Sequence, residues 1–212
     1  MDTITVFSGL SKDNSPIGFT HCQRVGEIIA EKGYKMVCAG ASIGCQSKLI
    51  EGAQGKGGTV IAVTVPMFAH ELSESLQKNA IISDGKDLSQ RKVIMKKATE
   101  FGYIILPGGP GTLDELWEVL AEKSENINDG AKKRLIIVNT DGFYEPVKHQ
   151  IEIMRSTFNW SHYGDGVDFI DDPEELNGLI PTYTKTGGKR KSYINRKIRN
   201  TRRKIKAVLP KE

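Results

Sequence analysis

The sequence has few of the residues that build metal sites or disulfide frameworks. It contains three cysteines among 212 residues, Cys22, Cys38 and Cys45. No two of them have CxxC spacing, so we expect neither a disulfide framework nor a zinc site. The four histidines are scattered, without metal-ligand spacing. The cysteines are therefore expected to be small buried apolar residues in a reducing compartment.

Long apolar runs are also absent from the sequence. No stretch approaches the roughly 20 residues that a bilayer-spanning helix needs. The N-terminus leads directly into the strand-like run from Ile4 to Phe7, without a basic and apolar leader. We therefore expect a soluble cytoplasmic protein. Hydrophobic residues make up 38% and charged residues 26%, which is the balance of an ordinary globular chain with one sizeable core.

Two common nucleotide-binding motifs are missing. The chain has no glycine loop ending in Lys-Ser or Lys-Thr and no GxGxxG fingerprint. These absences argue against a Walker-type phosphate loop and a dinucleotide fold of the common kind.

Positive charge is unevenly distributed. Residues 183–212 contain twelve Lys or Arg and one acidic residue, whereas residues 1–182 contain 18 basic and 25 acidic residues. We therefore predict a mildly acidic domain, 1–182, followed by a basic C-terminal tail, 183–212. The tail has two interpretations: a solvated or intramolecular extension, or a segment that grips the phosphates of a nucleic acid or another anionic partner.

Short apolar runs alternate with helical periods six or seven times along the chain. This alternation predicts an α/β fold, a Rossmann-like doubly wound parallel sheet in a single domain. Ligands of such sheets bind at the carboxyl ends of the strands. The expected strands are 4–7, 35–38, 59–65, 80–82, 103–106, 135–138 and 167–170, and the expected helices are 19–32, 45–56, 88–100, 112–123, 144–156 and 173–179.

The most informative segment is 106–115, which reads LPGGPGTLDE. It follows an apolar strand and opens a helix, and its glycines let several backbone N–H groups approach one point. We expect Thr112 to be the N-cap and Glu115 to complete a capping box. A helix N-terminus of this kind binds anions, so the segment predicts a phosphate site.

The same residues resemble the LOG (Lonely Guy) family, formerly described as lysine decarboxylase-like. The segment 107–115 matches the family's PGGxGTxxE motif, and Gln90, Arg91 and Lys92 stand where the family has an Arg-Lys pair. The first loop (6–11), the second glycine loop (40–44) and the turn 139–144 also resemble family segments.

The resemblance implies hydrolysis of the N-glycosidic bond of a nucleoside 5′-monophosphate, as in cytokinin activation. It implies a homodimer and no cofactor. Arg91 and Glu115 would be the catalytic pair. A carboxylate can stabilise the positive charge that develops on ribose, and an arginine can hold the phosphate or the leaving base. The substrate- and phosphate-binding residues would be Lys92, Gly108, Gly109, Gly111, Thr112, Asp114, Gly9, Ser11, Gly40 and Gly44.

The chain departs from the family pattern at two places near this site. Its second glycine loop carries Ala41 and Ser42 where the family often has glycine, and Ala121 to Ser124 replace the usual Thr-Trp-Ala-Gln stretch. The base is therefore left open between a cytokinin, a plain purine and a pyrimidine. The alternative function is a nucleotide or cofactor carrier without catalysis, or a LOG-like fold recruited to a nucleic-acid assembly through its tail.

Overall fold

The computed structural model describes residues 2–11, 15–82, 88–157 and 166–184. Residues 185–212 of the basic tail, with the nucleic-acid contacts that were one interpretation of it, lie outside the described residues. The domain boundary near residue 183 stays a prediction. Tyr183 is still part of the folded body, since its ring packs edge-on against Tyr34 and its N–H donates to the carbonyl of Lys32.

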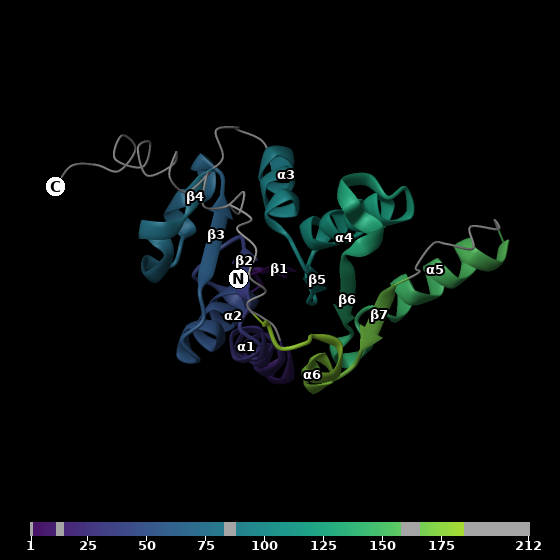
Figure 1. Cartoon of the computed structure of the whole chain (residues 1–212), viewed down its shortest axis with the longest axis horizontal. Helices are drawn as coiled ribbons and strands as arrows, with labels where there is room; N and C mark the ends of the chain where they lie inside the picture. Colours follow the sequence, from purple (N-terminus) through teal and green to yellow (C-terminus); the bar gives the residue numbers. More distant parts are fainter. Residues whose placement is uncertain (1, 12–14, 83–87, 158–165, 185–212) are drawn as a thin grey trace.

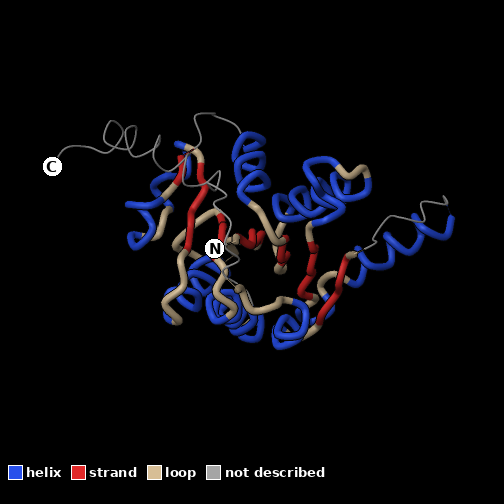
Figure 2. Tube along the Cα trace, in the orientation of Figure 1, coloured by secondary structure: helices blue, strands red, loops and turns tan. Residues whose placement is uncertain are grey.

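One sheet of seven parallel strands forms the centre of the described chain (Figures 1 and 2). Its order is β4-β3-β2-β1-β5-β6-β7. All five residues of β1 and of β3 are buried, as expected for parallel strands covered on both faces. The strands are β1 (Thr3–Phe7), β2 (Lys35–Cys38), β3 (Val60–Thr64), β4 (Ile81–Ile82), β5 (Gly102–Ile105), β6 (Arg134–Val138) and β7 (Val167–Ile170).

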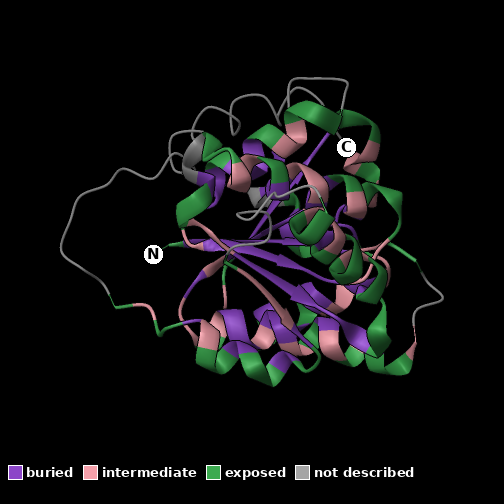
Figure 3. Cartoon of the chain, turned by 90° about the vertical axis from the view of Figure 1, so that its right-hand side faces the viewer, coloured by how far each residue is buried: buried purple, intermediate pink, exposed green. Residues whose placement is uncertain are grey.

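The helices form a layer on each face of the sheet, and the buried residues lie between them (Figure 3). Residues of α1, α2 and α6 pack in one apolar cluster, and those of α3, α4 and α5 in the other. The α-helices are α1 (Pro16–Glu31), α2 (Gly44–Gly55), α3 (Leu88–Ala98), α4 (Pro110–Ser124), α5 (Glu145–Thr157) and α6 (Leu176–Leu179). The 3-10 helices are η1 (Pro66–Glu71), η2 (Glu74–Asn79), η3 (Ile127–Lys132), η4 (Thr140–Gly142) and η5 (Pro173–Glu175).

The predicted Rossmann-like sheet and its order of elements are confirmed. The chain builds outward from β1 to β4, returns through α3 to place β5 beside β1, and then builds outward to β7. The direction of winding therefore reverses between β1 and β5. Crevices at such a reversal are the usual ligand sites of open α/β sheets.

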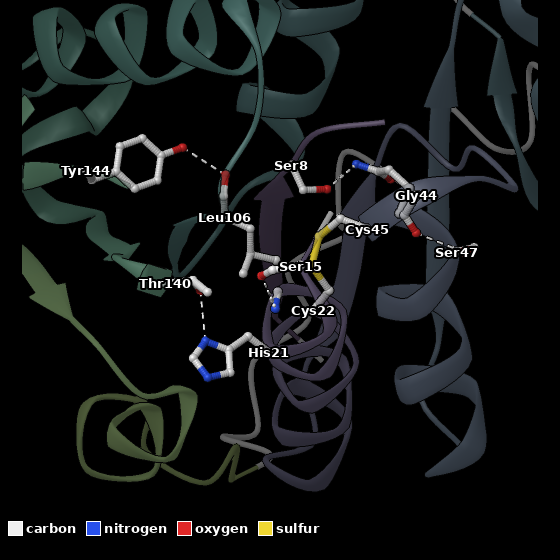
Figure 4. The surroundings of a disulfide bond; sticks show 12 residues. Ser8, Ser15, His21, Cys22, Gly44, Cys45, Ser47, Leu106, Thr140 and Tyr144 are labelled. Carbon is white, nitrogen blue, oxygen red and sulfur yellow. Dashed lines mark hydrogen bonds between the residues drawn. A yellow bond between two sulfur atoms is a disulfide. The ribbon is translucent and has the colours of Figure 1, made fainter. Parts of the chain in front are cut away.

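The expectation that the cysteines form no disulfide is wrong for one pair. Cys22 on α1 and Cys45 on α2 are joined, with their Cα atoms 5.5 Å apart (Figure 4). The two helices come close because they meet at glycines: a methyl group added to Gly26 would lie 2.9 Å from the backbone nitrogen of Ala53. The odd count and the wide spacing gave no sign of this pair. Cys38 fits the original expectation, since it is free and fully buried.

Among the described residues, no helix is long and apolar enough to pass through a bilayer.

Candidate active site

The loops after β1 and β5 are in direct backbone contact at the point where the sheet reverses. Gly9 N–H donates to the carbonyl of Pro107 over 3.0 Å. A methyl group added to Gly9 would lie 2.9 Å from the Cα of Gly108, and one added to Gly108 would lie 2.8 Å from the nitrogen of Gly9. Only glycine at both positions permits this approach, so the two loops together form one floor.

Helix α4 begins in this floor, one turn earlier than the sequence indicated. Gly109 is the N-cap and Pro110 the first helical residue. The prediction that Thr112 caps the helix is therefore wrong: its N–H bonds to the carbonyl of Gly109, and its side chain makes no capping bond there. Proline is favoured at the first helical position because it has no N–H to satisfy. The early start leaves an anion-binding helix terminus at the glycine loop.

A cavity of about 220 Å³ lies over the floor. It combines backbone from both loops with side chains from α2, α3 and α4. Its lining residues are Val6, Phe7, Ser8, Gly9, Leu10, Ala39, Gln46, Arg91, Met95, Gly109, Pro110, Gly111, Thr112 and Glu115.

The predicted catalytic pair meets in this cavity. Arg91 donates from a terminal nitrogen to Glu115 Oε1 over 2.9 Å, and their side chains are 16% and 8% exposed. Burial raises the pKa of the Glu115 carboxyl to about 7, although the charge and the hydrogen bond of Arg91 oppose the rise. Perturbed carboxyls of this kind, in a cavity beside a cation, are typical of active sites. Arg91 Nε is buried without a hydrogen-bond partner in the described structure.

A ladder of ion pairs continues from this pair along α3 and α4. Lys92 Nζ lies 2.7 Å from Asp114 and 2.8 Å from Glu118. Lys96, only 4% exposed, pairs with both Glu118 and Glu122. Burial alone would lower the pKa of Lys92, but its two carboxylate partners outweigh it and raise the pKa. The ladder fixes the register of α3 against α4, and so places Arg91 opposite Glu115.

The turn after β6 anchors the strand end from which the glycine loop starts. Asn139, which is buried, accepts from Tyr144 N–H over 2.7 Å and donates to Glu145 and Asp171. Tyr144 is fully buried and donates its hydroxyl to the carbonyl of Leu106 over 2.8 Å (Figure 4). The segment that resembled a family turn thus anchors the strand end that precedes the glycine loop.

The second glycine loop lies behind the cavity. Gly40 and Gly44 both have positive φ angles, of 86° and 61°. Neither lines this cavity or the two cavities that adjoin it. The loop acts through Gln46, which is buried, accepts from Gly40 N–H over 3.2 Å and donates to Ser8 over 2.8 Å. A methyl group added to Gly44 would lie 2.7 Å from the carbonyl carbon of Leu10, so this loop also supports the floor.

The structure thus brings most of the predicted residues together. Six of the twelve line the cavity over the floor: Gly9, Arg91, Gly109, Gly111, Thr112 and Glu115. Ser11 and Gly108 line an adjoining cavity of about 470 Å³, which shares Gly9, Gly109 and Pro110 with the first. Lys92 and Asp114 line none of the three cavities and pair with each other instead. Their roles toward a ligand remain predictions.

Sequence reasoning missed Ser8, Gln46 and Met95. Gln46 was detectable in principle, because it is a polar residue on the buried face of a helix. Asp172 caps η5 in a capping box. Within the described ranges no group of three His, Cys, Asp or Glu side chains is placed to hold a metal ion.

Fold and site together define an α/β protein whose ligand site is a glycine floor at a strand reversal, with a buried Glu-Arg pair. Comparison with known proteins places the chain more narrowly. The family model described as "Possible lysine decarboxylase" matches residues 47–179, and the chain belongs to this family, the LOG family.

The relatives of known name agree with this assignment. A cytokinin riboside 5′-monophosphate phosphoribohydrolase of Rhodococcoides fascians is 28% identical over 156 residues, which cover 71% of this chain and 74% of that protein. A probable enzyme of the same name from Oryza sativa subsp. japonica is 31% identical over 147 residues. That match covers 68% of this chain but only 57% of the rice protein.

Solved structures share the fold. The molybdenum cofactor binding protein of Rippkaea orientalis superposes with a TM-score of 0.63 at 20% identity, covering 84% of this chain and 94% of that one. The Moco carrier protein of Chlamydomonas reinhardtii gives 0.61 at 21% identity, with the same coverage.

Proposed function

We propose that this protein hydrolyses the N-glycosidic bond of a nucleoside 5′-monophosphate and releases the free base and ribose 5-phosphate. One observation carries the proposal. Glu115, with a pKa of about 7, shares a cavity with the glycine floor and pairs with Arg91. Family membership supports the same class of activity, that of a nucleoside monophosphate phosphoribohydrolase.

The floor suits the 5′-phosphate. The start of α4 offers backbone N–H groups and the positive end of a 15-residue helix. A methyl group added to Gly109 or Gly111 would meet nothing within 4 Å, so both glycines face open space. A phosphate held there would place the ribose one turn further along α4, beside Glu115.

The Glu115–Arg91 pair can promote the reaction at C1′ of the ribose. Water attacks C1′ as the C1′–N bond breaks, and the bond electrons and one proton pass to the base nitrogen. Positive charge builds on the ribose in the transition state, and the Glu115 carboxylate stabilises it or takes the proton of the attacking water. Arg91 donates hydrogen bonds to the departing base. With a pKa of about 7, Glu115 has both protonation states available at neutral pH.

The test is a nucleotide screen. The protein is incubated with adenosine, N6-substituted adenosine, guanosine and pyrimidine 5′-monophosphates, and free base is followed by chromatography. We expect release from at least one nucleotide, and loss of release in Glu115→Gln with the fold retained by circular dichroism. A folded wild type that releases no base from any of them would overturn the proposal.

A carrier is the second candidate, because the solved structures with this fold include a molybdenum cofactor binding protein and a Moco carrier protein. It predicts ligand binding by calorimetry without turnover. Homodimer formation, a cytoplasmic location and nucleic-acid binding through residues 183–212 are further proposals. Light scattering tests the first. Deletion of the tail should abolish any salt-dependent RNA or DNA binding if the last is correct.

A further inference from the structure

Two polar residues that no sequence motif assigned to the site line the cavity over the floor. Ser8 directly follows β1 and is 7% exposed, and Gln46 lies in the first turn of α2 and is 1% exposed. Both line this cavity and neither of the two that adjoin it, and the same is true of Glu115. The neighbouring cavities meet this one through different residues, namely Gly9, Gly109 and Pro110 on one side and Leu10, Ala39 and Arg91 on the other. Ser8, Gln46 and Glu115 therefore line its middle part, where a phosphate on the floor would place the ribose.

Two hydrogen bonds fix the orientation of the Gln46 amide. The N–H of Gly40, which can only donate, lies 3.2 Å from Gln46 Oε1, so the amide oxygen must face Gly40. The amide nitrogen then faces Ser8 and donates to its Oγ over 2.8 Å. Cys45, the preceding residue, is joined to Cys22 on α1, which holds this turn of α2 in place. The direction of the bond from Gln46 to Ser8 is therefore determined by the backbone.

This direction decides where the Ser8 proton points. Because the Ser8 oxygen accepts from Gln46, its own proton has to be donated elsewhere. Among the described residues no carbonyl, carboxylate or hydroxyl accepts it. A buried hydroxyl normally has an acceptor for its proton, and the open direction at Ser8 is the cavity. The Gln46–Ser8 pair thus presents one hydrogen-bond donor to the molecule that occupies the middle of the cavity.

We propose that Ser8 is a further substrate-contacting residue whose hydroxyl donates to a ribose hydroxyl oxygen, and that Gln46 is the positioning residue that keeps the Ser8 proton directed into the cavity. The inference rests on the proposed hydrolase function. A ribose hydroxyl is both an acceptor and a donor, so it can accept from Ser8 and donate to the Glu115 carboxylate. Contacts to both residues would hold C1′ in position beside Glu115, so the rate depends on them.

Gln46→Glu separates this role from a purely structural one. The substitution keeps the size of the side chain and the oxygen that accepts from Gly40 N–H. An ionised carboxylate cannot donate, so the Ser8 hydroxyl would turn its proton toward residue 46 and away from the cavity. If Gln46 only satisfies Gly40, the variant should keep its activity. If it orients Ser8, the variant should behave as if the Ser8 hydroxyl had been removed.

The first experiment measures kcat/KM at pH 8 for the nucleotide that the screen identifies. Ser8→Ala and Gln46→Glu should each lose about three- to tenfold, the value of one neutral hydrogen bond. The double variant should lose no more than Ser8→Ala alone, because both changes remove the same donor. Ser47→Ala is the matched control, since the Ser47 hydroxyl donates to the carbonyl of Gly44 and lines none of the three cavities. Circular dichroism checks that each variant is folded.

The second experiment tests the contact with the sugar. The 2′-deoxy and 3′-deoxy forms of the same nucleotide are compared on wild type and Ser8→Ala. For the form that lacks the hydroxyl bound by Ser8, the variant should lose less than about twofold, because the contact is already absent. General damage to the cavity would instead reduce kcat/KM equally for all three forms.

Three results would overturn the inference. They are a folded Ser8→Ala variant with wild-type kcat/KM, an equal loss on all three sugars, and a folded Gln46→Glu variant that keeps full activity while Ser8→Ala does not. If Gln46→Glu does not fold, the comparison of sugars on Ser8→Ala decides alone. Failure of the hydrolase proposal would look different, with no base released by the wild type from any nucleotide. In that case the Kd values of AMP and its two deoxy forms, measured by calorimetry on the same variants, replace kcat/KM.

Discussion

Glu115 should cost the protein stability at neutral pH, and this cost can be measured without any ligand. Burial raises its pKa from 4.5 to about 7, so the folded state favours the protonated carboxyl. The protonated Glu115 carboxyl stabilises the folded state fully below pH 4.5, and this stabilisation is lost as the pH rises to 7. Above pH 7 the free energy of unfolding is therefore lower by roughly 3 kcal/mol than it is at acid pH.

Replacing Glu115 with glutamine removes the titration and keeps the shape. The free energy of unfolding of Glu115→Gln relative to wild type should therefore increase by about 2 to 3 kcal/mol between pH 5 and pH 8. The steepest change lies between pH 5 and pH 7. The gain arises because the variant no longer ionises a buried carboxyl, even though Arg91 loses its charged partner.

The assay is urea unfolding followed by circular dichroism at pH 5, 6, 7 and 8. Glu118→Gln on the same helix is the control. The pKa of Glu118 is lowered from 4.5, because its hydrogen bonds to Lys92 and Lys96 outweigh burial. Its stabilising effect is therefore lost only as the pH falls below about 4.5, so the stability difference of Glu118→Gln should stay nearly constant from pH 5 to pH 8. A stability difference for Glu115→Gln that stays constant over this range would refute the reasoning.

Three further predictions concern the framework of the site. Gly108→Ala should raise KM at least tenfold and destabilise by about 1 to 3 kcal/mol, because the added methyl would lie 2.8 Å from a backbone nitrogen. Gly109→Ala, whose methyl would meet nothing within 4 Å, is the control for stability, and equal losses of the two in urea unfolding would contradict the prediction. Lys96→Met should cost about 3 to 5 kcal/mol in unfolding free energy, because two glutamates lose a buried partner, whereas a neutral result would show that the ladder contributes little. Cys22→Ser, or reduction of the bond to Cys45, should lower the unfolding free energy by about 3 kcal/mol, and the absence of any effect of a reductant would argue against the disulfide in solution.

The sheet and the glycine loop were predictable because their signals are local. Buried parallel strands read as continuous apolar runs, and the segment 106–115 carries its turn and its helix start together. The helix start was misplaced by one turn because Thr112 offered a good cap in sequence, while Pro110 fits the first helical position equally well.

What sequence reasoning missed depends on tertiary contacts. The disulfide requires α1 and α2 to touch, which no local pattern encodes. Gln46 reaches the cavity only because loops after different strands meet at one edge of the sheet. The pairing of Lys92 with Asp114 and Glu118, where a phosphate contact was expected, follows from the rotation of α3 against α4.

The contact between Gly9 and Gly108 limits how this site can diversify. Each glycine is required by the backbone of the other, so no side-chain change elsewhere can compensate for the loss of either. Substitution of either glycine therefore disrupts the floor and cannot alter its shape gradually. Changes of substrate during evolution or in the laboratory should therefore arise from the side chains that line the cavity and leave both glycines in place.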